Sequence, residues 1–166
     1  MSATKAAKPG RPEVVILVGL QGSGKSTLFR ERFAGTHVHI SKDRLPRSAD
    51  KRRRQRQLIE EALSKGQSIA VDNTHPTRVD REEIISQARA RGARVIGYYV
   101  EAPVADCLRR NALRKGIERV PPAAIYTTQK RLEPPSHDEG FDALYLARLR
   151  EDEGRFEVRP IVPTRG

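Results

Sequence analysis

The sequence predicts one α/β domain in which helices flank a parallel β-sheet. Short apolar runs alternate along the chain with longer polar segments of helical periodicity. The first of these runs, at 14–18, leads into a glycine-rich loop that a helix follows. A chain of 166 residues has the size of one domain, and it buries about two-thirds of its unfolded surface without needing disulfides or structural metals.

The elements are read from periodicity and from the residues at their ends. Residues 14–18 are apolar and mostly β-branched, which is typical of a strand buried on both faces. Glycines end two helices, and Pro134-Pro135 ends the last one. Further strands are expected at 37–40, 68–72 and 94–100, with one or two more at 144–147 and 156–161, and helices are expected at 25–33, 50–65, 77–91, 103–115 and 123–132.

The chain is expected to consist of a disordered basic tail, residues 1–11, and one domain over 12–166. The tail offers no apolar face to bury. Cys107 is the one cysteine of the sequence, so an intrachain disulfide is excluded. No apolar run has the length of a signal sequence or a membrane span. A cytoplasmic protein without a membrane partner is expected.

The sequence is strongly basic, with a net charge of +11 and a pI near 10.4. Such a charge favours a polyanionic partner, since clustered cations release counterions when they neutralise phosphates. A solvated basic surface explains the charge equally well. The densest basic run is Lys51-Arg52-Arg53-Arg54-Gln55-Arg56, which can guide a nucleic-acid backbone.

The glycine-rich loop matches the pattern G-x-x-x-x-G-K-[ST] of a P-loop. Its glycines allow backbone N–H groups to point at phosphate oxygens, and the following helix adds positive potential at its N-terminus. Lys25 is expected to reach the β- and γ-phosphates of ATP or GTP, and Ser26 to ligate Mg²⁺. The expected nucleotide-binding residues are Gly19, Leu20, Gln21, Gly22, Ser23, Gly24, Lys25, Ser26 and Thr27.

Two acidic residues follow neighbouring strands of the predicted sheet. Asp43 comes after the second strand and Asp72 ends the third. Ligands of open α/β sheets bind beyond the carboxyl ends of the strands, so both carboxylates are expected near the γ-phosphate. There a carboxylate accepts a hydroxyl proton or holds Mg²⁺ through water. The alternative is ordinary turn and capping chemistry.

Arg110 and Arg114 lie on the helix expected after the fourth strand. Four residues apart, they share a helix face and can converge on one set of phosphate oxygens. The segment after them, 115–122, has the composition of a mobile loop, so a small helical lid is expected at about 109–124. An exposed basic helix face is the alternative.

Taken together, the motifs resemble the kinase domain of polynucleotide 5′-hydroxyl kinases, over about residues 11–149. The resemblance implies the P-loop kinase three-layer fold, with five parallel strands in the adenylate-kinase-like order. The matching segments are Pro12-Glu13-Val14-Val15, Gly22-Ser23-Gly24-Lys25-Ser26-Thr27, His37-Val38-His39-Ile40-Ser41-Lys42-Asp43, Val71-Asp72-Asn73-Thr74-His75-Pro76, Arg110-Asn111 with Arg114, Val120-Pro121, Leu132-Glu133-Pro134-Pro135 and Glu139-Gly140-Phe141.

The resemblance also implies residue roles. Asp43 would be the general base, Asp72 the acid that holds Mg²⁺ through water, Arg110 a nucleotide contact, and Arg114 with Lys25 the groups that stabilise phosphate during transfer. The acceptor would contact Arg44, Arg47 and Asn73. The viral members carry an acid and an arginine where this chain has Arg44 and Pro46, and relatives typically have asparagine where it has His75.

The function expected from these observations is a kinase that moves the γ-phosphate of ATP, with Mg²⁺, to the 5′-hydroxyl end of DNA or RNA. Two alternatives remain. One is a small-molecule kinase with the same loop, since the fold does not fix the acceptor. The other is a nucleotide-dependent binding module that transfers no phosphate.

Overall fold

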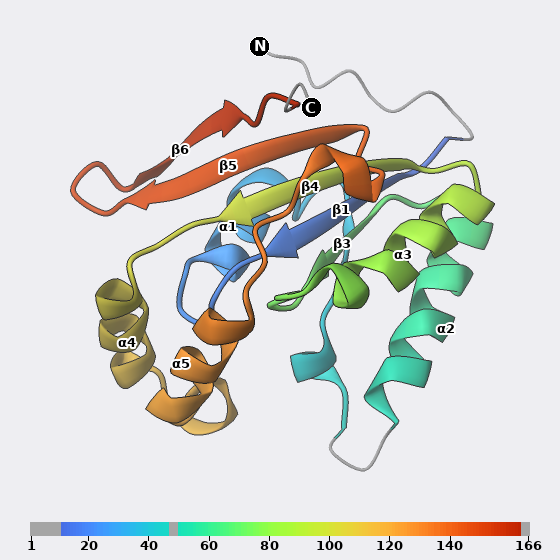
Figure 1. The fold of residues 1–166 in the computed structure, drawn as a ribbon. Coiled ribbons are helices and arrows are strands. Elements are labelled where there is room, and N and C mark those ends of the chain that lie inside the picture. The colour runs from blue at the N-terminus through green and yellow to red at the C-terminus, as the bar shows by residue number, and fades with distance from the viewer. Residues whose placement is uncertain (1–10, 47–49, 164–166) are drawn as a thin grey trace.

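The computed structural model describes residues 11–46 and 50–163, and its helices flank a twisted sheet (Figure 1). The expected basic tail at 1–11 lies almost wholly outside these residues. The elements are β1 Glu13–Val18, α1 Lys25–Arg32, β2 Val38–Ile40, η1 Lys42–Arg44, α2 Lys51–Ser64, β3 Ile69–Asp72, α3 Arg78–Ala90, β4 Arg94–Val100, α4 Val104–Leu113, η2 Gly116–Glu118, α5 Pro122–Arg131, η3 His137–Glu139, β5 Ala143–Arg150 and β6 Arg155–Pro160.

In the described part of the chain the sheet has the strand order β2-β3-β1-β4-β5-β6. The first five strands are parallel, and β1 lies at the centre between β3 and β4. In the β1–β3 register Leu17 lies opposite Asp72, so the loop after β1 and the turn after β3 leave the sheet side by side. This order agrees with the adenylate-kinase-like order that the sequence resemblance implies.

The sheet differs from the expected five parallel strands by one added antiparallel strand. β6 pairs with β5 from Tyr145 opposite Pro160 to Arg150 opposite Arg155. The connection at 151–154 is a tight turn, and a parallel pair needs a crossover of a dozen or more residues. The chain can therefore only return antiparallel, and β6 becomes the edge of the sheet.

The two faces of β1 enter two separate hydrophobic clusters. Val14 and Ile16 belong to a cluster with side chains of α2 and α3, such as Ile59 and Ile84. Val15 and Leu17 instead pack with side chains of α1 on the opposite face. A strand covered on both faces needs an unbroken apolar sequence, which explains the run at 14–18.

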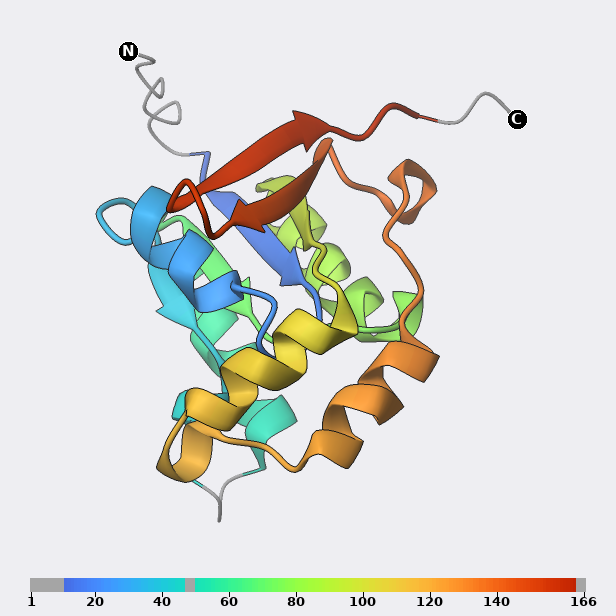
Figure 2. The same cartoon turned by 90° about the vertical axis from the view of Figure 1, so that its left-hand side faces the viewer.

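A third cluster joins the P-loop to α4 and α5 at the carboxyl end of the sheet (Figure 2). Leu20 of the loop is buried with Cys107 of α4 and Ile125 of α5. A Cβ atom on Gly22 would lie 2.6 Å from the backbone oxygen of Cys107, so only glycine permits this approach. Among the described helices, none combines the length and apolar character that crossing a bilayer requires.

Candidate active site

The P-loop connects β1 to α1 and carries a lysine held inside it. Gly22 and Gly24 have φ angles of 82° and 109°, which lie in the left-handed region that favours glycine. The Lys25 ammonium donates hydrogen bonds to the carbonyl oxygens of Gly19, at 3.0 Å, and Leu20, at 2.8 Å. Lys25 is thus positioned by the loop itself.

Burial lowers the pKa of Lys25 to about 8, and the positive charge of Arg114 acts in the same direction. The carboxylates of Asp72 and Asp43 oppose this shift. All three charged side chains therefore lie within electrostatic range of the ammonium. Polyphosphate would stabilise the charged form of Lys25 further.

Asp72, at the end of β3, is buried and accepts two side-chain hydrogen bonds. Ser26 Oγ donates to its Oδ2 at 2.8 Å, and His39 Nε2 donates to the same oxygen at 2.8 Å. Burial acts to raise the pKa of Asp72, but these hydrogen bonds and the charge of Lys25 hold it below its usual value. The hydroxyl and the carboxylate are oxygen donors of the kind that Mg²⁺ prefers.

His39 connects Asp72 to Arg44. The Arg44 guanidinium donates to His39 Nδ1 at 3.0 Å, which leaves Nε2 as the nitrogen that donates to Asp72. The His39 ring also stacks on Phe29 of α1, with centroids 4.0 Å apart. Arg44, which the resemblance assigns to the acceptor, here orients the histidine that holds Asp72.

Asp43 lies in η1, a short helix tied to the ends of β3 and α2. The Asp43 backbone N–H donates to Ser41 Oγ at 3.2 Å, and the Lys42 N–H donates to Asn73 Oδ1 at 2.9 Å. Asn73 Nδ2 in turn donates to Gln55 Oε1 at 2.7 Å. The Asn73 amide therefore positions the segment that carries Asp43.

His75 occupies the turn after β3 in a strained conformation. Its φ angle is 46°, an uncommon value for a residue with a side chain. Its ring is buried, and Nδ1 donates to the backbone oxygen of Leu17 at 2.6 Å. Burial lowers the pKa of His75 to about 4, so Nε2 remains an acceptor at neutral pH and faces the Asn73 amide at 3.3 Å.

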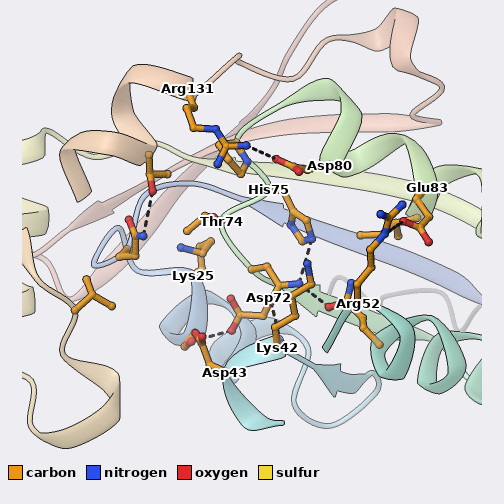
Figure 3. A pocket seen from close by; sticks show the side chains of 18 of the residues that line it. Lys25, Lys42, Asp43, Arg52, Asp72, Thr74, His75, Asp80, Glu83 and Arg131 are labelled. Carbon is orange, nitrogen blue, oxygen red and sulfur yellow. Dashed lines mark hydrogen bonds and ion pairs between the residues drawn. The ribbon is translucent and has the colours of Figure 1, made fainter. Parts of the chain in front are cut away.

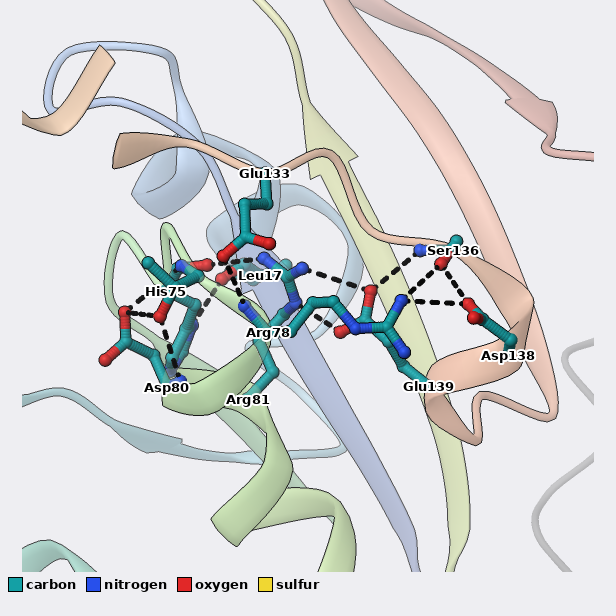
Figure 4. Close-up of polar contacts among 10 residues, drawn as sticks. Leu17, His75, Arg78, Asp80, Arg81, Glu133, Ser136, Asp138 and Glu139 are labelled. Atoms are coloured by element: carbon teal, nitrogen blue, oxygen red, sulfur yellow. Dashed lines mark hydrogen bonds and ion pairs between the residues drawn. The ribbon is translucent and has the colours of Figure 1, made fainter. Parts of the chain in front are cut away.

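A buried ion pair supports this turn from the other side (Figure 4). Arg81 of α3 donates from Nε and from a terminal nitrogen to the two carboxylate oxygens of Glu139, at 2.7 and 3.0 Å. Another terminal nitrogen of Arg81 donates to the backbone oxygen of His75 at 2.8 Å. The strained turn is thus fixed both by its ring and by its carbonyl group.

A polar cavity of about 510 Å³ extends from the P-loop to the groove between α2, α3 and α5 (Figure 3). It brings together eight of the sixteen residues for which the sequence predicts a binding or catalytic role. Those that line it are Gln21, Gly22, Lys25, Ser26, Asp43, Asp72, Asn73 and Arg114. Arg44 and Arg110 do not line it, nor do the P-loop residues Gly19, Leu20, Ser23, Gly24 and Thr27. Arg47 lies outside the described residues.

The expectation that Arg110 and Arg114 share a helix face is wrong, because α4 ends at Leu113. Arg114 is the C-cap, with an extended ψ of 154°, so it leaves the helical path and lines the cavity beside Glu118. Arg110 instead donates to the Gly22 carbonyl oxygen at 2.9 Å and to Glu151 in the β5–β6 turn. The pKa of Glu151 is lowered to about 2 by hydrogen bonds from Arg109 and Arg110.

Two cavity residues of α5, Thr128 and Arg131, carry no sequence motif and were not predicted. Gln55 receives the Asn73 amide, and Gln21 Nε2 donates to Thr128 Oγ1 of α5 at 3.1 Å. Arg131 of α5 lies 3.8 Å from Asp80 of α3 at the far wall. Gln21 belongs to the P-loop motif, and Gln55 interrupts a basic run at the helical position that faces inward.

Sequence comparison connects the chain to kinases. The profile of a family described as AAA domain matches residues 14–135. A relative from Acanthamoeba polyphaga mimivirus, named as a bifunctional polynucleotide phosphatase/kinase, is 27% identical over an alignment of 144 residues. The match covers 82% of this chain and 33% of the relative. The protein of that name from Schizosaccharomyces pombe is 28% identical over an alignment of 138 residues, and the match covers 81% of this chain and 33% of the relative. The chain thus spans about a third of the length of these relatives.

Solved structures share the fold at low sequence identity. A fungal RNA kinase has a TM-score of 0.62 at 19% identity, over 83% of this chain and 38% of that one. The complex of AvrRxo1-ORF1 and AvrRxo1-ORF2 with ATP has a TM-score of 0.68 at 16% identity, over 89% of this chain and 57% of that one. A gluconokinase from Sinorhizobium meliloti 1021 has a TM-score of 0.53 at 21% identity, over 75% of this chain and 77% of that one.

The family match covers more than half of the chain and includes every motif from β1 to the end of α5. The strand order, the P-loop after the central strand and the carboxylates at the neighbouring strand ends agree with it. This chain belongs to the AAA domain family and has the fold of the P-loop kinases.

Proposed function

We propose that the protein is an ATP-dependent kinase that phosphorylates the 5′-hydroxyl end of DNA or RNA. The observation that carries this proposal is the shared cavity: Asp43 and Lys25 line it together, within electrostatic range of each other. A phosphate donor on the P-loop would face Asp43, and the groove beyond Asp43 leaves room for an acceptor. The names of the two sequence relatives point to the same acceptor class.

In the proposed reaction the acceptor oxygen attacks the γ-phosphorus while the bond to the β–γ bridging oxygen breaks, and ADP leaves. Asp43 accepts the hydroxyl proton, and Lys25 with the loop N–H groups holds the β- and γ-phosphates. Arg114 stabilises the charge on the transferred group. Arg110 is proposed to contact the nucleotide from the outer side of the P-loop.

Mg²⁺ would neutralise charge on the β- and γ-phosphates when bound. Ser26 would ligate it directly and Asp72 through water, since their oxygens lie 2.8 Å apart beside Lys25 in the cavity. The segment at about 109–124 is proposed to act as a lid, because its middle part contributes Arg114 and Val120 to the cavity wall.

A small-molecule kinase is the second candidate. The cavity of about 510 Å³ lies within the size range of small-ligand sites. Its lining is mostly polar, which suits a polyol as well as a sugar–phosphate backbone. The acceptor therefore has to be decided by assay.

The deciding experiment offers γ-labelled ATP and Mg²⁺ with 5′-hydroxyl oligonucleotides of DNA and RNA, and with free nucleosides and sugars. Label on the oligonucleotides supports the proposal, whereas label on a small molecule alone supports the second candidate. Tight ATP binding without any turnover would indicate a binding module.

The Asp43→Asn variant tests the proposed base. Its kcat should fall by about 10² to 10⁴, while its Kd for ATP stays unchanged. Asp152→Asn is the matched control, because Asp152 is an exposed carboxylate in the β5–β6 turn, outside the cavity. An unchanged kcat in Asp43→Asn would remove Asp43 as the base.

A further inference from the structure

Past Asp43, the cavity is lined by two arginines of α2 that share one acidic partner on α3. We propose that Arg52 and Arg56 form a subsite for the backbone phosphates that follow the 5′ end of the acceptor strand. This inference rests on the proposed function, since it names how that function's acceptor is held. It also predicts that the subsite reads no base sequence.

The arrangement of the two arginines is set by Glu83 (Figure 3). Arg52 Nε donates to Glu83 Oε2 at 3.0 Å, and Arg56 Nε donates to Oε1 at 2.8 Å. The arginines are four residues apart, so they lie one turn, about 6 Å, apart along α2. A single carboxylate therefore orients both guanidinium groups toward the same groove.

The charges of this cluster leave it positive. Two guanidinium groups share one carboxylate, and each guanidinium has five N–H donors, of which Glu83 engages only a part. The arginine side chains are 72% and 54% exposed, whereas Glu83 is 30% exposed. The unused donors are accessible in the groove, and guanidinium suits the geometry of phosphate oxygens.

The helical period of α2 places some of its basic residues on the cavity side and others on the solvent side. Of the run from Lys51 to Arg56, only Arg52 and Arg56 line the cavity along with Gln55. Arg53 and Arg54 are exposed and do not line it. The same helix therefore carries two inward arginines and two outward arginines of equal charge, which is a built-in control.

The cavity wall favours a backbone over a base as the ligand. Among the described residues that line it, there is no Phe, Tyr or Trp, and its apolar members are small or aliphatic, such as Val79 and Ile84. Base stacking on aromatic rings is the usual sequence-tolerant contact to single strands. The His75 ring in the lining is buried, so contacts to phosphates are favoured over base stacking.

The test compares Arg52→Ala/Arg56→Ala with Arg53→Ala/Arg54→Ala. The substrates are a 5′-hydroxyl oligonucleotide and copies with a neutral methylphosphonate at the first or second linkage. The inward pair should raise the oligonucleotide KM about tenfold with kcat within about twofold, and the outward pair should change KM by less than about twofold. Wild-type protein should lose affinity for a methylphosphonate copy, and the inward variant should show no further loss.

Oligonucleotide binding, followed by fluorescence anisotropy, makes the inference independent of turnover. The inward variant should reduce the salt-dependence slope of log Kd by about 1.4, which corresponds to two phosphates of a single strand. If the inward variant loses oligonucleotide binding and the outward variant does not, the subsite is supported even when no phosphate is transferred. The absence of transfer would then count against the proposed function and not against the subsite.

Three results would overturn the subsite. One is an equal effect of the inward and outward variants on KM and Kd. Another is an undiminished penalty of the methylphosphonate in the inward variant, since that would place the phosphate elsewhere. The last is a free nucleoside used with the same kcat/KM as the oligonucleotide. Base changes near the 5′ end should alter kcat/KM by less than about threefold.

Discussion

The Arg81 guanidinium and the Glu139 carboxylate form a two-point ion pair between α3 and η3, and their side chains are 0% and 4% exposed. Arg81 also donates to the backbone oxygen of His75. Glu139 in turn accepts a hydrogen bond from the Ser136 N–H at 2.8 Å. The pair therefore links the segment before β5 to the turn that follows Asp72 and Asn73.

Breaking this pair from one side should destabilise the fold. Arg81→Met leaves the Glu139 carboxylate buried without its partner, which typically costs about 3–5 kcal/mol of unfolding free energy. Urea unfolding measures it. Arg78→Ala is the control, because the Arg78–Asp138 pair joins the same two elements but its side chains are 44% and 71% exposed, and exposed pairs contribute below about 1 kcal/mol. Equal losses in both variants would contradict the structural role of the buried pair.

The buried His75 ring should make the fold acid-sensitive. The pKa of His75 is about 4 in the folded protein, against 6.5 as the ordinary value. Between these values the unfolded chain binds the additional proton, so stability falls as pH drops from 6.5 to 4, by about 3 kcal/mol. His75→Asn should lose this part of the pH dependence in urea titrations. If the pH dependence of the unfolding free energy is the same in the variant as in the wild type, another group causes the acid sensitivity.

Nucleotide affinity should depend on the protonation of Lys25. Since its pKa is about 8 without nucleotide, the Kd for ATP should rise above pH 8, by up to roughly tenfold per pH unit, and binding should take up protons there. Calorimetry in buffers of different ionisation enthalpy measures this uptake. Lys25→Arg keeps the charge at high pH and should flatten the profile. A constant Kd up to pH 9.5 in the wild type would contradict the prediction.

The Ser26–Asp72 pair predicts a specific magnesium requirement. Asp72→Asn keeps the size of the side chain but removes the charge, so the Mg²⁺ concentration for half-maximal transfer should rise about tenfold. Binding of ATP without Mg²⁺ should change much less. Glu153→Gln, in the β5–β6 turn, is a control for loss of one acid. An equal Mg²⁺ requirement in all three proteins would remove Asp72 from the metal site.

Local sequence patterns predict most of the fold. The strands from β1 to β4 follow from apolar runs, and each described α-helix begins within one residue of its expected start. The antiparallel direction of β6 was not predicted, since it depends on whether residues 151–154 turn back or cross over. The end of α4 at Leu113 was missed for a similar reason, because no glycine or proline marks it.

The residues of the site also divide into those that local sequence patterns predict and those that they do not. The P-loop is a continuous motif, and Asp43 and Asp72 are found by their places after strands. The contacts that hold these residues join distant parts of the chain. Arg81 and Glu139 are 58 residues apart, and Gln21 and Thr128 are 107 apart. Such partners become neighbours only through tertiary packing, which no local pattern encodes.

The contact between Gly22 and Cys107 limits how this molecule can close around a ligand. Because a Cβ on Gly22 would meet the Cys107 backbone and Leu20 is buried against α4, moving the P-loop away from α4 would break close packing. We therefore expect the proposed lid to move mainly at 114–121, between α4 and α5, while residues 109–113 of α4 stay against the P-loop. Opening and closing would swing a strap of a few residues that includes Arg114, so nucleotide exchange should require only a local rearrangement, with no rotation of a whole helical subdomain.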